Sequence, residues 1–147
     1  MSKRINILKL EPDAYKAIMA LENYMEHSGI NKTHWELLKI RASQINGCAY
    51  CMDSHSREAR AHGETERRIY VLNGWRDTPF FTEEEKAILA LTEEVTTISN
   101  GGLTDQTYAQ AISVLGEHYT AKVIMAVITI NAWNRIGIST RMEPESL

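Results

Sequence analysis

Two cysteines, one histidine and one glutamate are the residues of this sequence whose types and spacing could do chemistry together. Two residues separate Cys48 from Cys51, three separate Cys51 from His55, and eleven separate Glu36 from Cys48. On a helix, the two cysteines would lie about 60° apart around the axis and ~4.5 Å apart along it, a separation that a disulfide accepts. The pair could therefore alternate between dithiol and disulfide with little backbone movement.

A proton relay to these thiols also follows from helix geometry. His55 and Cys51 are four positions apart, so they would be neighbours on one helix face, where an imidazole can exchange a proton with a thiol. If the helix begins near Cys48, its first-turn amides and its dipole would favour a thiolate at Cys48 instead. A second helix folded back about Gly47 would bring Glu36 near His55, where its carboxylate could orient the imidazole. The spacing favours Cys51 as the attacking thiol and the dipole favours Cys48.

These residues have structural explanations as well. Thr33 and Glu36 have the spacing of a capping box, in which both side chains accept bonds from backbone amides at a helix start. A Cys-x-x-Cys pair can simply be buried, and a histidine on a helix commonly lies at the surface. We expect such a structural or surface role for the four histidines that lack a cysteine at helical spacing, namely His27, His34, His62 and His118.

Two other settings for this residue set are less favoured. Cysteine, histidine and glutamate are zinc ligands, but donors spread along two turns of one helix converge poorly on a single ion. We therefore expect no metal ion at these residues. A thioredoxin fold also carries Cys-x-x-Cys, but it requires strand–helix–strand units, and the pattern contains no credible pair of strands.

The elements that must position these residues are predicted to be helices throughout. Apolar spacing, capping patterns and glycines indicate helices over residues 12–28, 33–46, 48–62, 65–73, 82–97, 104–115 and 119–138. The last segment is apolar on nearly every face, which is typical of a helix buried among others or in a subunit interface. We predict one all-α domain over residues 1–147, with about six or seven helices.

The composition favours a globular domain and argues against a nucleic-acid-binding, secreted or membrane protein. The 147 residues are 44% hydrophobic and 24% charged, enough for one domain with its own core. The net charge is −3 with mixed signs, which argues against a nucleic-acid partner. The first ten residues lack the apolar core of a signal peptide, and no apolar run approaches the ~20 residues of a membrane span. We expect a cytoplasmic protein without a membrane partner, in a compartment that keeps cysteines reduced.

The pattern Glu-x11-Cys-x2-Cys-x3-His resembles the motif of the alkylhydroperoxidase D-like branch of the carboxymuconolactone decarboxylase superfamily. The likeness is strongest over residues 33–63 and continues over residues 73–93. The resemblance implies a small helical subunit, assembled into trimers or hexamers, with cofactor-free thiol peroxidase activity. Its substrates would be hydrogen peroxide or organic hydroperoxides, and a lipoyl- or thioredoxin-like dithiol would recycle it. The superfamily's decarboxylases lack the redox pair, so we do not expect the reaction that names them.

By position, the resemblance assigns Glu36 and His55 to a proton relay and Cys48 and Cys51 to a redox pair, with Cys51 as the attacking thiol. The sequence departs from the best-known members at Tyr50, where they carry a histidine before the second cysteine. The relay could therefore be shorter here. The alternative function is a non-catalytic redox sensor or interaction subunit whose Cys48–Cys51 disulfide controls assembly.

Overall fold

Helix caps and glycines divide the chain close to where the sequence predicts. The structure, a computed structural model, describes residues 4–146, and within this range it contains helices and no strand. The predicted all-α fold class is therefore confirmed. The elements in chain order are α1 Ile7–Leu10, α2 Pro12–His27, α3 Lys32–Asn46, α4 Ala49–Ala61, α5 Glu66–Tyr70, the 3₁₀-helix η1 Leu72–Asp77, α6 Glu83–Thr96 and α7 Asp105–Thr140.

Three elements differ from the expectation. The short helix α1 was not predicted, and η1 includes residues that were expected to be a loop. The predicted helices 104–115 and 119–138 are both present as the two parts of α7, separated by a kink with non-helical backbone at Gly116. The φ of 75° and ψ of 163° at Gly116 belong to a region that glycine adopts readily and other residues do not. The break was thus expected in the right place, but the chain bends there without a connecting loop.

The start of α3 corrects one predicted cap. The side chain of Asn31 accepts bonds from the backbone amides of Thr33 at 2.8 Å and His34 at 3.4 Å. The capping box predicted from Thr33 and Glu36 is therefore wrong. The helix already includes Lys32, and Asn31 is the N-cap residue that accepts hydrogen bonds from its first free amides. Glu36 lies inside the helix and its carboxylate is available for another role.

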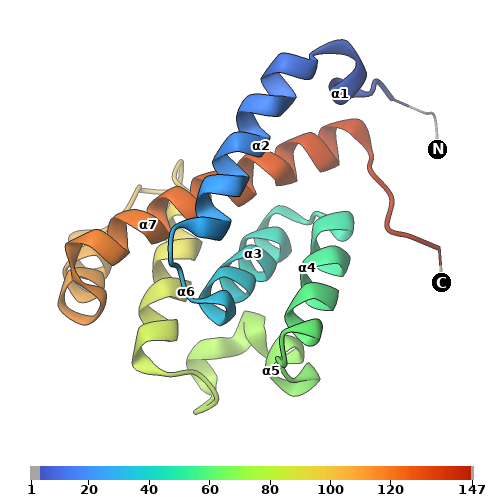
Figure 1. Cartoon of the computed structure of the whole chain (residues 1–147). Helices are drawn as coiled ribbons and strands as arrows, with labels where there is room; N and C mark the ends of the chain where they lie inside the picture. The colour runs from blue at the N-terminus through green and yellow to red at the C-terminus, as the bar shows by residue number, and fades with distance from the viewer. Residues whose placement is uncertain (1–3, 147) are drawn as a thin grey trace.

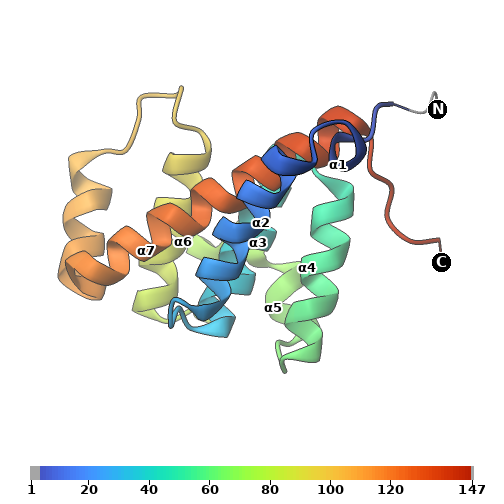
Figure 2. The same ribbon diagram turned by 45° about the horizontal axis from the view of Figure 1, so that its top comes forward.

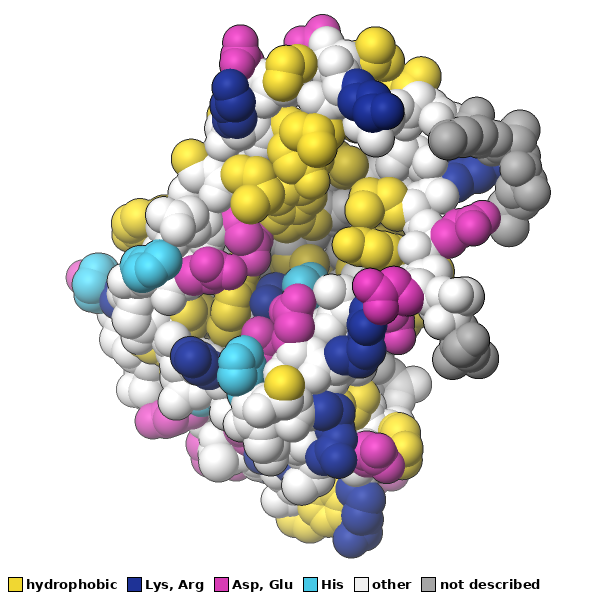
Figure 3. Space-filling model, turned by 45° about the vertical axis from the view of Figure 1, so that its right-hand side comes forward, with side chains coloured by type: hydrophobic (Ala, Val, Ile, Leu, Met, Phe, Trp, Pro, Cys, Tyr) yellow, Lys and Arg dark blue, Asp and Glu magenta, His cyan; other side chains and the backbone are white. Residues whose placement is uncertain are grey.

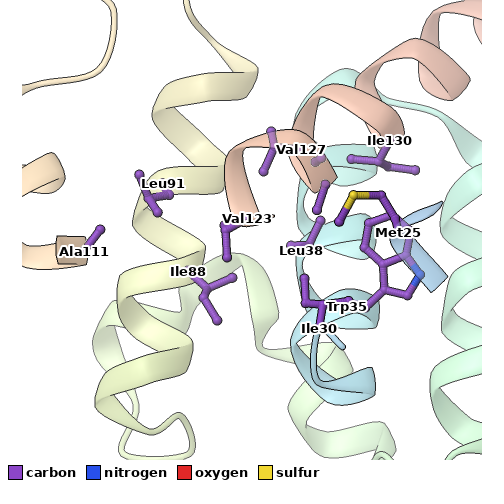
Figure 4. Packing of buried hydrophobic residues seen from close by; sticks show 12 residues of the cluster. Met25, Ile30, Trp35, Leu38, Ile88, Leu91, Ala111, Val123, Val127 and Ile130 are labelled. Atoms are coloured by element: carbon purple, nitrogen blue, oxygen red, sulfur yellow. The ribbon is translucent and has the colours of Figure 1, made fainter. Parts of the chain in front are cut away.

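The bundle is assembled around α7 (Figures 1 and 2). Helices α2, α3, α4 and α6 all contact α7, and α3 also packs against α4 and α6. Apolar side chains from α2, α3, α6 and α7 meet in the main core (Figure 4), which includes Met25, Trp35, Leu38, Ile88, Leu91, Val123, Val127 and Ile130. A second cluster lies against α3, formed by Leu37, Ile40, Ala59, Leu72, Trp75, Phe81 and Leu89. Helix α3 is thus buried over most of its surface, including two of its charged residues.

Helix α7 is the longest apolar element of the described chain. It is long and apolar enough to cross a membrane by length and mean hydropathy, although polar and charged residues interrupt its apolar runs. A core helix passes the same test, and buried Asn131 and Asn134 of α7 form hydrogen bonds with neighbouring helices. Only 28% of the most apolar stretch of α7 is buried inside the molecule. Several apolar side chains of α7 are exposed, among them Met125, Ile128 and Ile138.

Candidate active site

The two cysteines lie at the turn between α3 and α4. Gly47 ends α3 in the left-handed conformation, with φ 72°, which lets the chain reverse without the steric cost of a side chain. Cys48 is the N-cap of α4, and its Sγ accepts a bond from the backbone amide of Cys51 at 3.3 Å. The expected disulfide joins Cys48 and Cys51, whose Cα atoms are 5.3 Å apart. Both residues are buried, with exposed fractions of 2% and 4%.

His55 lies one helical turn after Cys51 on α4, as the spacing predicts. Its Nδ1 lies 2.9 Å from Oε2 of Glu58 and 3.9 Å from Oε2 of Glu36. The predicted proximity of Glu36 is present, but the carboxylate within hydrogen-bond distance of the imidazole is that of Glu58. Glu58 was not among the residues predicted from the sequence. Its position three residues after His55, on the same face of α4, was the available signal.

Lys39 connects the two carboxylates. Its Nζ lies 3.1 Å from Oε1 of Glu36 and 3.3 Å from Oε2 of Glu58, and it stacks over the ring of Trp35 at 4.7 Å from the centroid. The side chain is buried, so its positive charge is compensated by these two carboxylates rather than by water. Lys39 was also missed, although it follows Glu36 by one helical turn.

The two carboxyl groups have opposite pKa shifts. The pKa of Glu58 is lowered to about 2, mainly by its hydrogen bond with His55. The charge of Lys39 also lowers this pKa, whereas partial burial raises it. Burial raises the pKa of Glu36, which Lys39 opposes. Oε2 of Glu36 is buried without a hydrogen-bond partner among the described residues. Glu58 therefore stays ionised at neutral pH, whereas Glu36 is the carboxyl group that accepts a proton more readily.

This charge arrangement determines how the imidazole can act. An ionised carboxylate accepts a hydrogen bond, so the proton between His55 and Glu58 belongs on Nδ1. When the ring is neutral, its lone pair lies on Nε2, to which no described residue forms a hydrogen bond. In that form His55 can accept a proton at Nε2.

A third carboxyl group faces the cluster from α2. Oε2 of Glu22 accepts a bond from Nε1 of Trp133 at 2.9 Å, and burial raises the pKa of Glu22 while the charges of Lys39 and His55 lower it. Glu22 was not predicted, because nothing in the local pattern relates α2 to the cysteine motif. Figure 3 shows acidic, basic and histidine side chains at the edge of a hollow lined by hydrophobic side chains on this face of the molecule.

The other histidines have the structural or surface settings that were expected. Nδ1 of His34 lies 2.8 Å from the hydroxyl of Tyr119, a contact that ties α3 to α7, and burial lowers the pKa of His34. Nδ1 of His27 lies 2.8 Å from a backbone oxygen of its own helix. His62 is exposed, although its Nδ1 comes within 4.0 Å of Oε1 of Glu36.

The cluster does not fit a resident metal ion. Glu36, His55 and Glu58 each offer a ligand atom, all within 4.8 Å of one another. The ammonium of Lys39, however, already lies against both carboxylates and compensates their charge. A divalent cation would have to displace a buried lysine to bind there.

Comparison with known proteins places this site in a family. The sequence pattern of the carboxymuconolactone decarboxylase family matches residues 12–94, which include the cysteines, His55 and all three carboxylates. The chain belongs to this family. The AhpD-like resemblance of the motif is also confirmed, by a relative and by a solved structure.

Three known proteins show what the chain is similar to. The uncharacterized protein YdfG of Bacillus subtilis is 41% identical over 139 residues, which cover 95% of each chain. Alkyl hydroperoxide reductase AhpD of Maricaulis maris is 40% identical over 47 residues, which cover 32% of this chain and 27% of AhpD. A crystal structure from Agrobacterium tumefaciens, described as a protein of unknown function and candidate antioxidant defence protein AhpD, has a TM-score of 0.95 and 38% identity, covering 99% of this chain and 100% of the other.

Proposed function

We propose that the protein is a thiol-dependent peroxidase that reduces hydrogen peroxide or organic hydroperoxides. The observation that carries this proposal is the Cys48–Cys51 disulfide at the start of α4, one turn before a histidine whose Nδ1 is bonded to an ionised carboxylate. Reversible cysteine oxidation needs such a pair, and a proton acceptor on the same helix face supports thiolate formation. AhpD-like relatives support the same chemistry.

The proposed reaction has three steps. The thiolate of Cys51 attacks the peroxide, so that an S–O bond forms, the O–O bond breaks, and the leaving oxygen takes a proton to give an alcohol or water. The thiol of Cys48 then attacks the sulfenic sulfur of Cys51, forming the disulfide and releasing water. An external dithiol finally returns two electrons and two protons, restoring both thiols and leaving as a disulfide itself.

The surroundings support a division of roles between the cysteines. His55, through Nε2, would take the proton of Cys51 and return it to the leaving oxygen, while Glu58 holds the proton on Nδ1. Cys48, as the N-cap, is favoured as a thiolate by the amides and dipole of α4. A stabilised thiolate is a good leaving group, so the reductant would attack Cys51 and release Cys48.

The proposed reductant is a lipoyl- or thioredoxin-like dithiol, acting in the cytoplasm without a cofactor. A dithiol resolves the mixed disulfide internally, because its second thiol closes a ring as it leaves. Both protein sulfurs are almost fully buried, which favours a slender dithiol arm over a broad protein surface.

The test is rapid-mixing measurement of peroxide consumption by the reduced protein, with mass spectrometry after one equivalent of peroxide. We expect a rate well above that of free cysteine, a loss of two hydrogens, no turnover in Cys51→Ser, and a trapped sulfenic acid on Cys51 in Cys48→Ser. A rate no faster than free cysteine for every hydroperoxide tried, or full activity in Cys51→Ser, would refute the proposal.

One observation favours the alternative function of redox sensing. Helix α7, part of whose apolar surface faces outward, passes directly over the disulfide at Gly137. A change in the sulfurs could therefore be transmitted to a surface that binds another subunit. Size measurements on reduced and oxidised samples discriminate the two functions, since a redox-dependent change of assembly without peroxide turnover favours the sensor.

A further inference from the structure

Helix α7 approaches the disulfide at a glycine. A Cβ atom built on Gly137 would lie 3.2 Å from Sγ of Cys48 and 3.6 Å from Sγ of Cys51. Gly137 and Gly74 are the two glycines of the sequence that do not have a positive φ. Backbone conformation therefore does not explain the glycine at position 137. The contact with the two sulfurs does, because a side chain there would press on Cys48.

Three asparagines, which we call the asparagine clamp (Asn46, Asn131 and Asn134), hold α7 at this distance. Nδ2 of Asn46, the last residue of α3, donates to Oδ1 of Asn131 at 3.0 Å and to Oδ1 of Asn134 at 2.8 Å. Nδ2 of Asn134 donates to Oγ of Ser43 at 3.0 Å. Residues 131, 134 and 137 follow one another at three-residue spacing, so each is rotated by ~60° from the one before it, and Asn134 lies beside Gly137 on α7. The clamp therefore sets the register that places Gly137 over the sulfurs.

The two redox states of the cysteine pair need different amounts of space. Bonded sulfurs lie about 2.05 Å apart, whereas two thiol sulfurs cannot come closer than van der Waals contact, at roughly 3.5 Å. Reduction must therefore move at least one sulfur outward, in a region where both cysteines and Gly137 are buried. A packed interior has little free volume for such a movement. Either α7 yields or a cysteine side chain changes rotamer.

We propose that Gly137, held by the asparagine clamp, is a positioning residue that sets the equilibrium between disulfide and dithiol in the cysteine pair. On this proposal the closeness of α7 favours the disulfide, and of the two adjustments it is the last turn of α7 that gives way when the pair is reduced. The proposal deepens the proposed peroxidase function and rests on it, because it concerns the regulation of the same two sulfurs.

The experiment is a redox titration of the whole protein without peroxide. Each variant is equilibrated with mixtures of reduced and oxidised dithiothreitol, so that two electrons and two protons pass between the reagent and the Cys48–Cys51 pair. Alkylation of free thiols and mass spectrometry give the ratio of dithiol to disulfide, and hence the equilibrium constant.

Two variants should shift this equilibrium in opposite directions. In Gly137→Ala the added methyl group takes space that the dithiol needs, so we expect the disulfide to be favoured at least threefold more than in the unmodified chain. In Asn134→Ala the clamp is weakened and α7 can yield, so we expect at least a threefold shift toward the dithiol. Gly74→Ala is the matched control, because a Cβ atom there meets nothing within 4 Å, and its equilibrium should be unchanged.

A purely structural role would lower the stability of both variants without shifting the equilibrium in opposite directions. Unchanged equilibria, or shifts of both variants in one direction, would overturn the proposal. If Gly137→Ala does not fold, Asn134→Ala decides alone, with a shift toward the dithiol in support and any other result against. The titration contains no peroxide, so its result does not depend on peroxidase activity. Failure of the peroxidase proposal can therefore be distinguished from failure of this one.

Discussion

At the scale of residues, the candidate site holds two carboxyl groups near His55 whose pKa values are shifted in opposite directions. Glu58 bonds to Nδ1 of His55 and stays ionised, while Glu36 is buried against Lys39 and has a raised pKa. The family motif places Glu36 in the relay, yet the imidazole is oriented by Glu58. In the proposed reaction, the charge that would support an imidazolium at His55 therefore comes mainly from Glu58.

Replacement of Glu58 by glutamine tests this assignment. The amide oxygen of Glu58→Gln can still accept the bond from Nδ1, but it lacks the charge that stabilises protonated His55, so we expect kcat for peroxide to fall about tenfold at pH 7. The measurement is steady-state peroxide consumption with a dithiol reductant. The matched control is Glu83→Gln on an exposed turn of α6, which should keep full activity. An unchanged kcat in Glu58→Gln would show that His55 does not depend on this carboxylate.

The lowered pKa of Glu58 also predicts how stability depends on pH. A carboxyl group with a pKa of about 2 in the folded chain and 4.5 as its ordinary value binds its proton less tightly when folded. Its contribution to stability is complete above pH 4.5 and is lost as the pH falls toward 2. Glu58→Gln should therefore lower Tm at pH 7 and have a smaller effect near pH 2.5, measured by circular dichroism. The same loss of Tm at both pH values would contradict the assignment.

At the scale of elements, the hairpin of α3 and α4 positions every residue of the predicted motif. Its geometry could be predicted because its signals are local: Gly47 ends one helix, Cys48 caps the next, and His55 follows at helical spacing. The pairs His55–Glu58 and Glu36–Lys39 each lie within one helix at three-residue spacing, so they had a local signal that was missed. The contact of Lys39 with Glu58 could not be predicted, because it depends on the angle at which α3 and α4 cross and on side-chain rotamers.

The same division between local and long-range signals applies to the rest of the fold. The helix boundaries follow caps and glycines, and the helix predicted from residue 82 begins at a capping box formed by Thr82 and Glu85. The cap of α3 was assigned wrongly because Asn31 and Thr33 are both good N-cap residues two positions apart. The distance of Gly137 from the sulfurs depends on how α7 docks against α3, and it was not predictable from the sequence.

The corrected cap of α3 can be checked by a pair of substitutions. Asn31→Ala removes the side chain that accepts bonds from two backbone amides, so we expect the free energy of unfolding to fall by about 1 kcal/mol. Thr33→Ala removes no capping bond and should change the free energy of unfolding by less than about 0.5 kcal/mol. Urea unfolding monitored by circular dichroism measures both. A larger loss in Thr33→Ala than in Asn31→Ala would restore the capping box that the sequence predicted.

At the scale of the whole molecule, the unburied apolar side of α7 is the feature that the single chain does not explain. Ile128 and Met125 on α7 are 45% and 39% exposed, and a shallow groove beside them is lined by Val95, Ile128, Asn131, Ala132 and Arg135. Asn131 of the asparagine clamp also lines this groove. We propose that this side of α7 contacts another copy of the chain. The contact would build the homo-oligomer, a trimer or a hexamer, that the family resemblance implies.

A charge placed on this surface should separate the subunits. An ionised carboxylate is costly to bury in an apolar interface, so Ile128→Glu should convert the proposed oligomer into a monomer while leaving the helix content unchanged. Light scattering coupled to size-exclusion chromatography measures the mass. Ile98→Glu is the matched control, because Ile98 is 55% exposed in the turn after α6 and lies outside the groove. A monomeric unmodified chain, or an unchanged mass in Ile128→Glu, would mean that this side of α7 does not join subunits.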